Sequence, residues 1–156
     1  MTRTKLKDRI LPHYTRGEEI GNTLSHAVGV VFGLIVLISC LAISIQKNDV
    51  WSVVGSAIYG LSMVVLYAAS TLYHGTQNAT AKKVLQVVDH CTIYLLIGGT
   101  YTPILFSAIR PIYPTWCWVI FGVVWGLAII GTVFTAIDLK KYAKPHPFVR
   151  IFFEHF

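Results

Sequence analysis

The sequence predicts an all-α integral membrane protein, built as an antiparallel bundle of membrane-spanning helices. Of its 156 residues, 54% are hydrophobic and only 13% are charged, whereas soluble domains carry about 25% charged residues. Four long apolar segments hold this excess, and the basic residues gather in alternate stretches between them. An open strand would leave backbone amides unpaired in lipid, so each apolar segment is expected to be a helix.

The predicted elements follow one another with short connections. A basic amino-terminal segment, 1–23, comes first, and because it lacks a short apolar core with a cleavage site, we expect no cleavable signal peptide. Each apolar segment reaches the roughly 20 residues that a helix needs to cross about 30 Å of hydrocarbon. Short connections make neighbouring helices antiparallel, and 138–156 is expected to be a cytoplasmic tail or an incomplete fifth helix. The predicted spans are 24–45, 51–73, 84–109 and 115–137.

The distribution of Lys and Arg predicts how the bundle is oriented. Eleven of the 13 lie in the amino-terminal segment, in the second loop and after the fourth span, and only Lys47 and Arg110 lie in the other two connections. Since cytoplasmic loops carry the excess of basic residues, we expect both termini and the second loop in the cytoplasm. The aromatic residues expected at the outer interface are Trp51, Tyr113, Trp116 and Trp118.

Small residues four apart within the spans predict close helix packing. Generic packing explains such pairs better than a specific dimer motif does. Pro103 lies in the third span, where Thr100 and Thr102 are expected to help satisfy the carbonyls around a kink. The three cysteines lie in or beside apolar segments and are interpreted as packing residues. The small-residue pairs are Gly29/Gly33, Ser56/Gly60 and Gly122/Gly126.

This topology brings polar residues from three spans to one membrane face. On the first helix, if it extends back beyond the apolar segment, residues four apart share one stripe, and Ser70 and His74 share a face of the second. Asp89 lies about five residues inside the third span, roughly 7.5 Å deep. A carboxylate there costs about 2.5–3.5 kcal/mol if unpaired, so it should face a partner across the bundle. The residues concerned are Glu18, Glu19, Asn22, His26, Ser70, His74, Asp89 and His90.

Histidines, carboxylates and a hydroxyl are the ingredients of a metal-activated water. Imidazole binds zinc, which lowers the pKa of its water towards 7, and a nearby carboxylate orients that water. In this interpretation His74 is a ligand, Asp89 orients the water and Ser70 hydrogen-bonds beside them. The alternative is that each residue only meets water in the headgroup region, which explains any one of them better than their convergence. Helical spacing predicts that His90 diverges from Asp89, so we interpret it as structural.

Three motifs in this order resemble the bacterial hemolysin III family. They are Glu-Glu-Ile-Gly-Asn-Thr-Leu-Ser-His at 18–26, Ser-Thr-Leu-Tyr-His at 70–74, and Asp-His at 89–90 leading into 93–103. The resemblance runs from about 17 to 144. This family is the prokaryotic branch of the progestin and adipoQ receptors, related to alkaline ceramidases. The resemblance implies a seven-helix fold with the amino terminus inside, a zinc site near the cytoplasmic face and metal-dependent hydrolysis of a lipid or amide.

The family motifs carry over only in part. The last motif, His-x-x-x-His on the seventh helix, has no counterpart, because His146 and His155 are nine residues apart and would lie about 180° apart on a helix. The Zn²⁺ ligand set is therefore incomplete, and we expect the chain by itself to be inactive. It is interpreted as a truncated product, a fragment of a longer frame, or a short variant that oligomerises. The matching positions are Ser70 and His74, Asp89, and Glu19, Asn22 and His26.

The sequence leaves three functions open for this four-span part of a hemolysin III-type fold. The first is a zinc-dependent hydrolase of a membrane lipid or amide. The second is the pore-forming, cytolytic activity that the family name records, although the third span has no continuous polar stripe. The third is a receptor-like or membrane-homeostasis role without chemistry. We expect a multi-pass location in the bacterial inner membrane, membrane lipids as partners and no nucleic acid, and leave homo-oligomerisation open.

Overall fold

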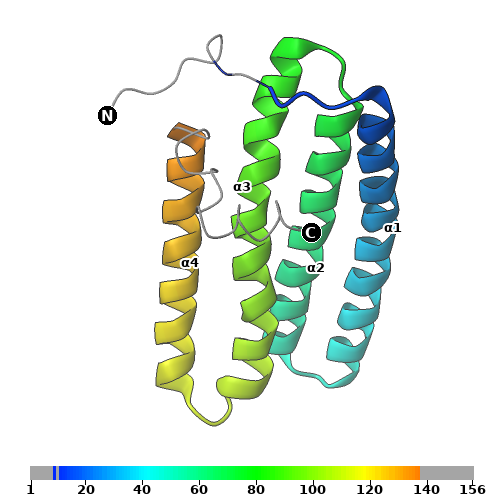
Figure 1. The fold of residues 1–156 in the computed structure, drawn as a ribbon. Helices are drawn as coiled ribbons and strands as arrows, with labels where there is room; N and C mark the ends of the chain where they lie inside the picture. Colours follow the sequence, from blue (N-terminus) through cyan, green and yellow to red (C-terminus); the bar gives the residue numbers. More distant parts are fainter. Residues whose placement is uncertain (1–8, 10, 138–156) are drawn as a thin grey trace, which may run out of the picture.

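The chain forms four long helices that run alternately up and down (Figure 1). The computed structural model describes residue 9 and residues 11–137, so residues 1–8, Ile10 and the expected tail or fifth helix at 138–156 lie outside the described part. Each predicted span lies within one helix, or within α3 and its continuation η2, and each is long and apolar enough to cross a membrane. The elements are α1 (Arg16–Gln46), α2 (Val50–Gly75), α3 (Ala79–Ile104), the π-helical η2 (Leu105–Ile109) and α4 (Pro114–Ile137).

Side-chain caps explain where the first three helices begin. Thr15 and Glu18 form a capping box, in which the Thr15 amide donates to Glu18 Oε2 at 2.6 Å and the Glu18 amide donates to Thr15 Oγ1 at 3.3 Å. The side chains of Asp49 and Asn78 accept hydrogen bonds from backbone amides at the starts of α2 and α3. Such caps satisfy amides that the first helical turn leaves without partners. The capping box starts α1 eight residues before the apolar segment, which places Glu19, Asn22 and His26 on the helix.

The helices lie side by side in chain order, with α1 and α4 at the two edges (Figure 1). α1 packs on α2, α2 on α3, and α3 on α4. α1 and α3 begin at one end of the bundle, and α2 and α4 end there. We call this end the amino-terminal end of the bundle. Many large apolar side chains on the outer faces are exposed, as expected for helices that meet lipid.

Glycines set the close approach of the first three helices. A Cβ added at Gly29 would lie 2.5 Å from the Tyr67 ring, and one at Gly60 would lie 2.8 Å from the Leu37 Cα. Ser44 and Ser56 also share a hydrogen bond of 2.7 Å between α1 and α2. Two of the predicted small-residue pairs thus lie in helix contacts. The third pair differs: an added Cβ at Gly122 or Gly126 would meet nothing within 4 Å among the described residues.

Pro103 marks the passage from α3 into η2. Thr102 Oγ1 donates to the Gly98 carbonyl at 2.7 Å and accepts from Trp125 Nε1 at 3.1 Å, which ties α3 to α4. Thr100 Oγ1 donates to the Leu96 carbonyl at 2.7 Å. Each threonine therefore bonds the carbonyl one turn before itself. Pro103 has no N–H, so the carbonyl that loses its helical donor is that of Gly99, and neither threonine bonds it.

The end of the bundle opposite the amino-terminal end is aromatic and apolar. Phe106 and Cys117 are buried there, and the rings of Trp51 and Trp118 meet edge to face with centroids 5.5 Å apart. The Arg110 guanidinium lies 4.4 Å from the Trp51 ring centroid. Trp51 and Trp118, two of the four predicted interface aromatics, therefore pack together, and Trp118 is exposed like the other two, Tyr113 and Trp116.

Candidate functional site

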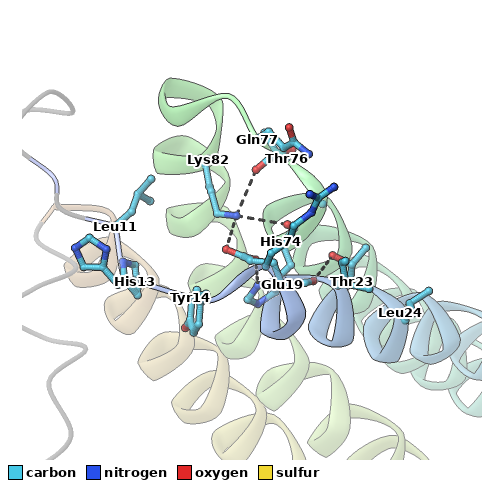
Figure 2. A pocket seen from close by; sticks show the side chains of 14 residues that line it. Leu11, His13, Tyr14, Glu19, Thr23, Leu24, His74, Thr76, Gln77 and Lys82 are labelled. Atoms are coloured by element: carbon cyan, nitrogen blue, oxygen red, sulfur yellow. Dashed lines mark hydrogen bonds and ion pairs between the residues drawn. The ribbon is translucent and has the colours of Figure 1, made fainter.

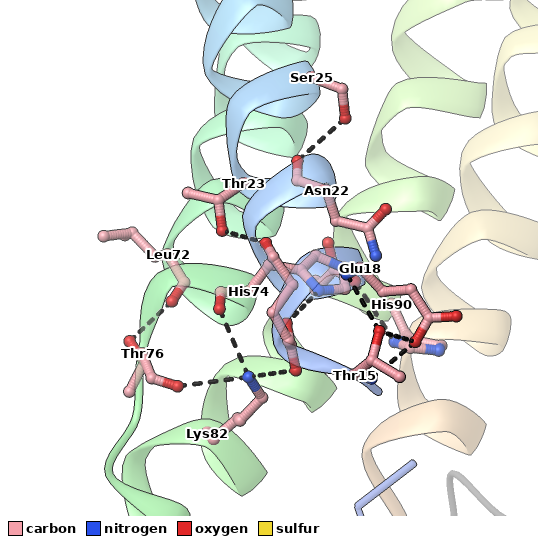
Figure 3. A network of polar contacts seen from close by, with 12 residues as sticks. Thr15, Glu18, Asn22, Thr23, Ser25, Leu72, His74, Thr76, Lys82 and His90 are labelled. Carbon is pink, nitrogen blue, oxygen red and sulfur yellow. Dashed lines mark hydrogen bonds and ion pairs between the residues drawn. The ribbon is translucent and has the colours of Figure 1, made fainter. Parts of the chain in front are cut away.

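Glu19 and His74, from the first two motifs, lie close together at the amino-terminal end of the bundle (Figures 2 and 3). α1 contributes Glu19 and His26 from its first turns, α2 contributes Ser70 and His74 from its last turns, and α3 contributes Asp89 from its first half. The alternation of helix direction is the reason that residues up to 70 positions apart in sequence share this end.

A carboxylate from α1 joins α2 to α3. Glu19 Oε2 accepts a hydrogen bond of 2.8 Å from His74 Nδ1, and Glu19 Oε1 lies 2.6 Å from Lys82 Nζ. Lys82 Nζ also donates to the carbonyls of His74 and Thr76, at 3.4 and 3.3 Å, where α2 ends. The side chains of Glu19, His74 and Lys82 are only 21%, 9% and 13% exposed. Figure 2 shows Lys82 reaching back across the α2–α3 connection to Glu19.

Aromatic rings surround the His74 imidazole. His26 stacks on it, with ring centroids 5.8 Å apart and planes within 6°. Tyr14, from the segment before α1, meets it edge to face at 5.6 Å. The neighbouring Tyr73 is buried, and Lys82 Nζ lies 5.3 Å from its ring centroid. With Nδ1 bonded to Glu19, only Nε2 of the His74 ring remains for another partner.

Tyr14 also connects this cluster to Asp89. Partial burial raises the pKa of the Tyr14 hydroxyl above its ordinary value, and the negative charges of Glu19 and Asp89 raise it further. Both carboxylates must lie near the ring for their charges to act on it. Tyr14 thus responds to carboxylates of both α1 and α3, although none of the motifs contains it.

The remaining predicted residues lie close by with weaker ties. Ser70 is buried and Asn22 is half-buried. Asp89 has a side chain 16% exposed, and its Oδ2 lies 3.6 Å from His90 Nδ1, which donates to the Gln86 carbonyl at 2.8 Å. The predicted divergence of His90 from Asp89 therefore differs from the structure, because the imidazole folds back along α3 towards the preceding turn.

Of the predicted site residues, His74 is held in the way that a metal-ligating histidine usually is. A ligating histidine characteristically donates its other ring N–H to a carboxylate, as His74 does to Glu19. In the part of the chain that the structure describes, however, no three His, Cys, Asp or Glu side chains are grouped to hold one ion. His74 is therefore held as a ligand would be, while zinc itself stays a prediction.

A cavity of about 790 Å³ opens beside the cluster (Figure 2). The segment before α1 forms one wall, and the α2–α3 connection forms another. Basic side chains outnumber acidic ones along its lining. The lining residues that bear charge or border the cluster are His13, Tyr14, Arg16, Glu19, His74 and Lys82.

Comparison with known proteins gives the family. The family model described as "Haemolysin-III related" matches residues 14–155. The chain therefore belongs to the haemolysin-III-related family. The resemblance drawn from the three motifs is confirmed.

Curated relatives of this family member are longer than the chain. "Hemolysin-3 homolog" of Bacillus subtilis is 35% identical over 136 residues, which cover 87% of this chain and 62% of the relative. "Hemolysin-3" of Bacillus cereus is 34% identical over 128 residues, covering 81% and 57%. Human "Monocyte to macrophage differentiation factor" is 28% identical over 104 residues, covering 62% and 41%. The chain thus spans about 60% of the length of the bacterial relatives, and no solved structure is significantly similar to it.

The motifs did not reveal Lys82 or Tyr14 as part of the cluster. Lys82 counted only towards orientation, and Tyr14 lies outside the apolar segments. One signal was present: Lys82 follows the Asn78 cap by four residues, which places it in the first turn of α3, at the end where Glu19 lies.

Proposed function

We propose that this chain is a multi-pass inner-membrane protein that carries part of a zinc-dependent hydrolase site at the cytoplasmic face. Its substrate would be a membrane lipid or amide. His74 would hold the metal, Asp89 would orient a water there and Ser70 would hydrogen-bond beside them. The observation that supports this most is the bond of 2.8 Å between His74 Nδ1 and Glu19, which fixes one tautomer and leaves the Nε2 lone pair free.

The residues around His74 position it before any ligand arrives. Glu19 holds the ring through Nδ1, Lys82 holds Glu19, and the stacked His26 restricts the ring plane. A bound zinc ion would supply a Lewis acid and a water of lowered pKa. The other two ligands of a three-histidine site would come from outside the described residues.

Zinc binding by the purified protein tests the proposal. Zinc affinity is measured in detergent by competition with a zinc-binding dye. We expect weak binding that His74→Ala abolishes and that Glu19→Gln lowers about 10- to 100-fold, the usual effect of removing a carboxylate behind a ligand. His90→Gln, on the neighbouring helix, is the matched control and should not change the affinity. Zinc binding that survives His74→Ala contradicts the proposal.

Cytolysis is the competing function, because the two bacterial relatives bear the name hemolysin. A pore needs a polar path through the bilayer, whereas the end opposite the cluster holds the buried apolar group of Leu105, Phe106 and Cys117. Chelator-insensitive conductance in planar bilayers would favour the pore over the hydrolase. A membrane lipidome unchanged by the protein, without conductance, would favour a role without chemistry.

A further inference from the structure

A second concave feature lies between α3 and α4 and shares no residue with the cluster around His74. It is a groove of about 450 Å³ with a largely apolar lining. α3 contributes Val87, Val88, Cys91, Thr92 and Leu95 to it, and α4 contributes the other wall. The residues of that wall are Trp125, Ala128, Ile129, Thr132 and Val133.

The groove is shorter than the hydrocarbon thickness of one bilayer leaflet. On each helix its lining spans eight residue steps, 87–95 and 125–133, or about 12 Å at 1.5 Å per residue. This is less than half of the roughly 30 Å hydrocarbon thickness. Since α4 ends at Ile137, only four residues after the lining, the groove occupies the half of the bundle nearer the amino-terminal end.

The groove is narrow on average and apolar. The volume of about 450 Å³ over about 12 Å of length gives a mean section of roughly 40 Å². A helix with its side chains is about 10–12 Å wide, or roughly 80–110 Å² in section. Among the described residues no charged side chain lines the groove, which suits the hydrocarbon part of a lipid.

A buried cation lies at the end of α4, just beyond the groove. Arg9 is 7% exposed, and its Nη2 donates to the Ala136 carbonyl at 2.9 Å. Its Nη1 is buried and has no hydrogen-bond partner in the part of the chain that the structure describes. A buried guanidinium with an unused donor is costly unless an anionic or polar acceptor completes it.

From these observations we infer that the α3–α4 groove binds one anionic phospholipid, with an acyl chain between the helices and its headgroup phosphate on Arg9. Arg9 offers a planar fork of donors suited to phosphate. This site is separate from the proposed hydrolase site and does not depend on it.

Short-range quenching by brominated lipid tests the inference. Trp125 lines the groove, so its fluorescence is measured in vesicles that contain a small mole fraction of phosphatidylglycerol or phosphatidylcholine brominated on the acyl chains. We expect phosphatidylglycerol to quench at about fivefold lower mole fraction, the preference that one basic residue near the surface supports. The other tryptophans are removed by Trp51→Phe, Trp116→Phe and Trp118→Phe.

Two variants separate the headgroup from the groove. Arg9→Gln should remove the preference for phosphatidylglycerol, while Arg16→Gln, which changes an exposed cation at the same end, should keep it. Val88→Phe keeps Arg9 but fills the groove, so it should reduce quenching by both lipids. This variant tests the groove even if Arg9→Gln folds poorly.

Four results would overturn the inference. Equal quenching by the two phospholipids, or a preference that survives Arg9→Gln, removes the role of Arg9. Stronger quenching by a brominated fatty acid than by phosphatidylglycerol identifies a free carboxylate as the ligand. Absent quenching together with rapid Cys91–Cys91 cross-linking shows that a second copy covers the groove.

Discussion

At the scale of single residues, Glu19 makes the connection on which the candidate site depends. Its two oxygens bond to side chains from two other helices, at 2.8 Å to His74 Nδ1 and 2.6 Å to Lys82 Nζ. Removing one member of a partly buried charged group leaves the others without partners, and this costs more than the bond contributes. Glu19 therefore both orients His74 and holds the ends of α2 and α3 to α1.

We expect Glu19 and Lys82 to be energetically coupled. In a double-mutant cycle of Glu19→Gln and Lys82→Met, the coupling free energy should be about 1 kcal/mol, above that of an exposed pair because both side chains are mostly buried. Denaturant unfolding in detergent gives the free energies of unfolding of the unchanged protein, the two single variants and the double variant. Lys47→Met, which changes an exposed cation in the α1–α2 connection, serves as the control and should show no coupling to Glu19→Gln. A coupling of zero for Lys82 would show that the contact contributes nothing.

The pKa of Tyr14 is expected to report both carboxylates of the site. The charges of Glu19 and Asp89 raise it on top of burial, because a nearby negative charge disfavours the tyrosinate. Glu19→Gln and Asp89→Asn should each therefore lower this pKa towards its ordinary value. NMR titration of ring-labelled tyrosine, assigned with Tyr14→Phe, measures it. Asp49→Asn, at the opposite end of the bundle, should leave it unchanged, and no response to Asp89→Asn would separate Asp89 from the cluster.

At the scale of helices, glycine determines how closely α1 and α2 approach. Gly29 faces the Tyr67 ring and Gly60 faces the backbone of Leu37. Small residues allow such contact in membranes, where packing and not the hydrophobic effect holds helices together. The open positions Gly122 and Gly126 on α4 show that spacing alone does not identify a contact.

Gly60→Ala should destabilise the bundle, and Gly126→Ala should not. The new Cβ at 60 would lie 2.8 Å from the Leu37 Cα, which only a helix shift can relieve, so we expect a loss of about 1–3 kcal/mol. At 126 the Cβ meets nothing within 4 Å in the described chain. Denaturant unfolding in the same detergent compares the two. Equal stability of the two variants would mean that α1 and α2 do not pack as described.

At the scale of the whole molecule, most of the architecture could be predicted and the details of the site could not. Long apolar segments dictate helices, and short connections dictate their alternation, so the gathering of motif residues at one end follows from topology. The contact of Lys82 with Glu19 depends on side-chain reach across the α2–α3 connection, which hydropathy does not encode. The position of Tyr14 depends on the path of the segment before the Thr15 cap.

The asymmetry of the two ends links this architecture to its orientation in the membrane. One end holds the charged cluster and the other holds Trp51, Phe106 and Trp118 in ring contact. Basic residues favour the cytoplasmic side, and aromatic residues occur at both interfaces. The distribution of basic residues therefore predicts that the cluster lies on the cytoplasmic side.

Thiol labelling in intact cells should confirm that placement. In a protein without native cysteines, Gln77→Cys marks the exposed α2–α3 connection and Ile112→Cys marks the exposed α3–α4 connection. We expect a membrane-impermeant maleimide to label Ile112→Cys in intact cells and Gln77→Cys only after permeabilisation. The reason is that eleven of the 13 basic residues belong to segments predicted to share the side of Gln77. Asn48→Cys, in the α1–α2 connection, should behave like Ile112→Cys. Labelling of Gln77→Cys in intact cells would put His74 and Asp89 at the outer face and remove the basis for a cytoplasmic hydrolase site.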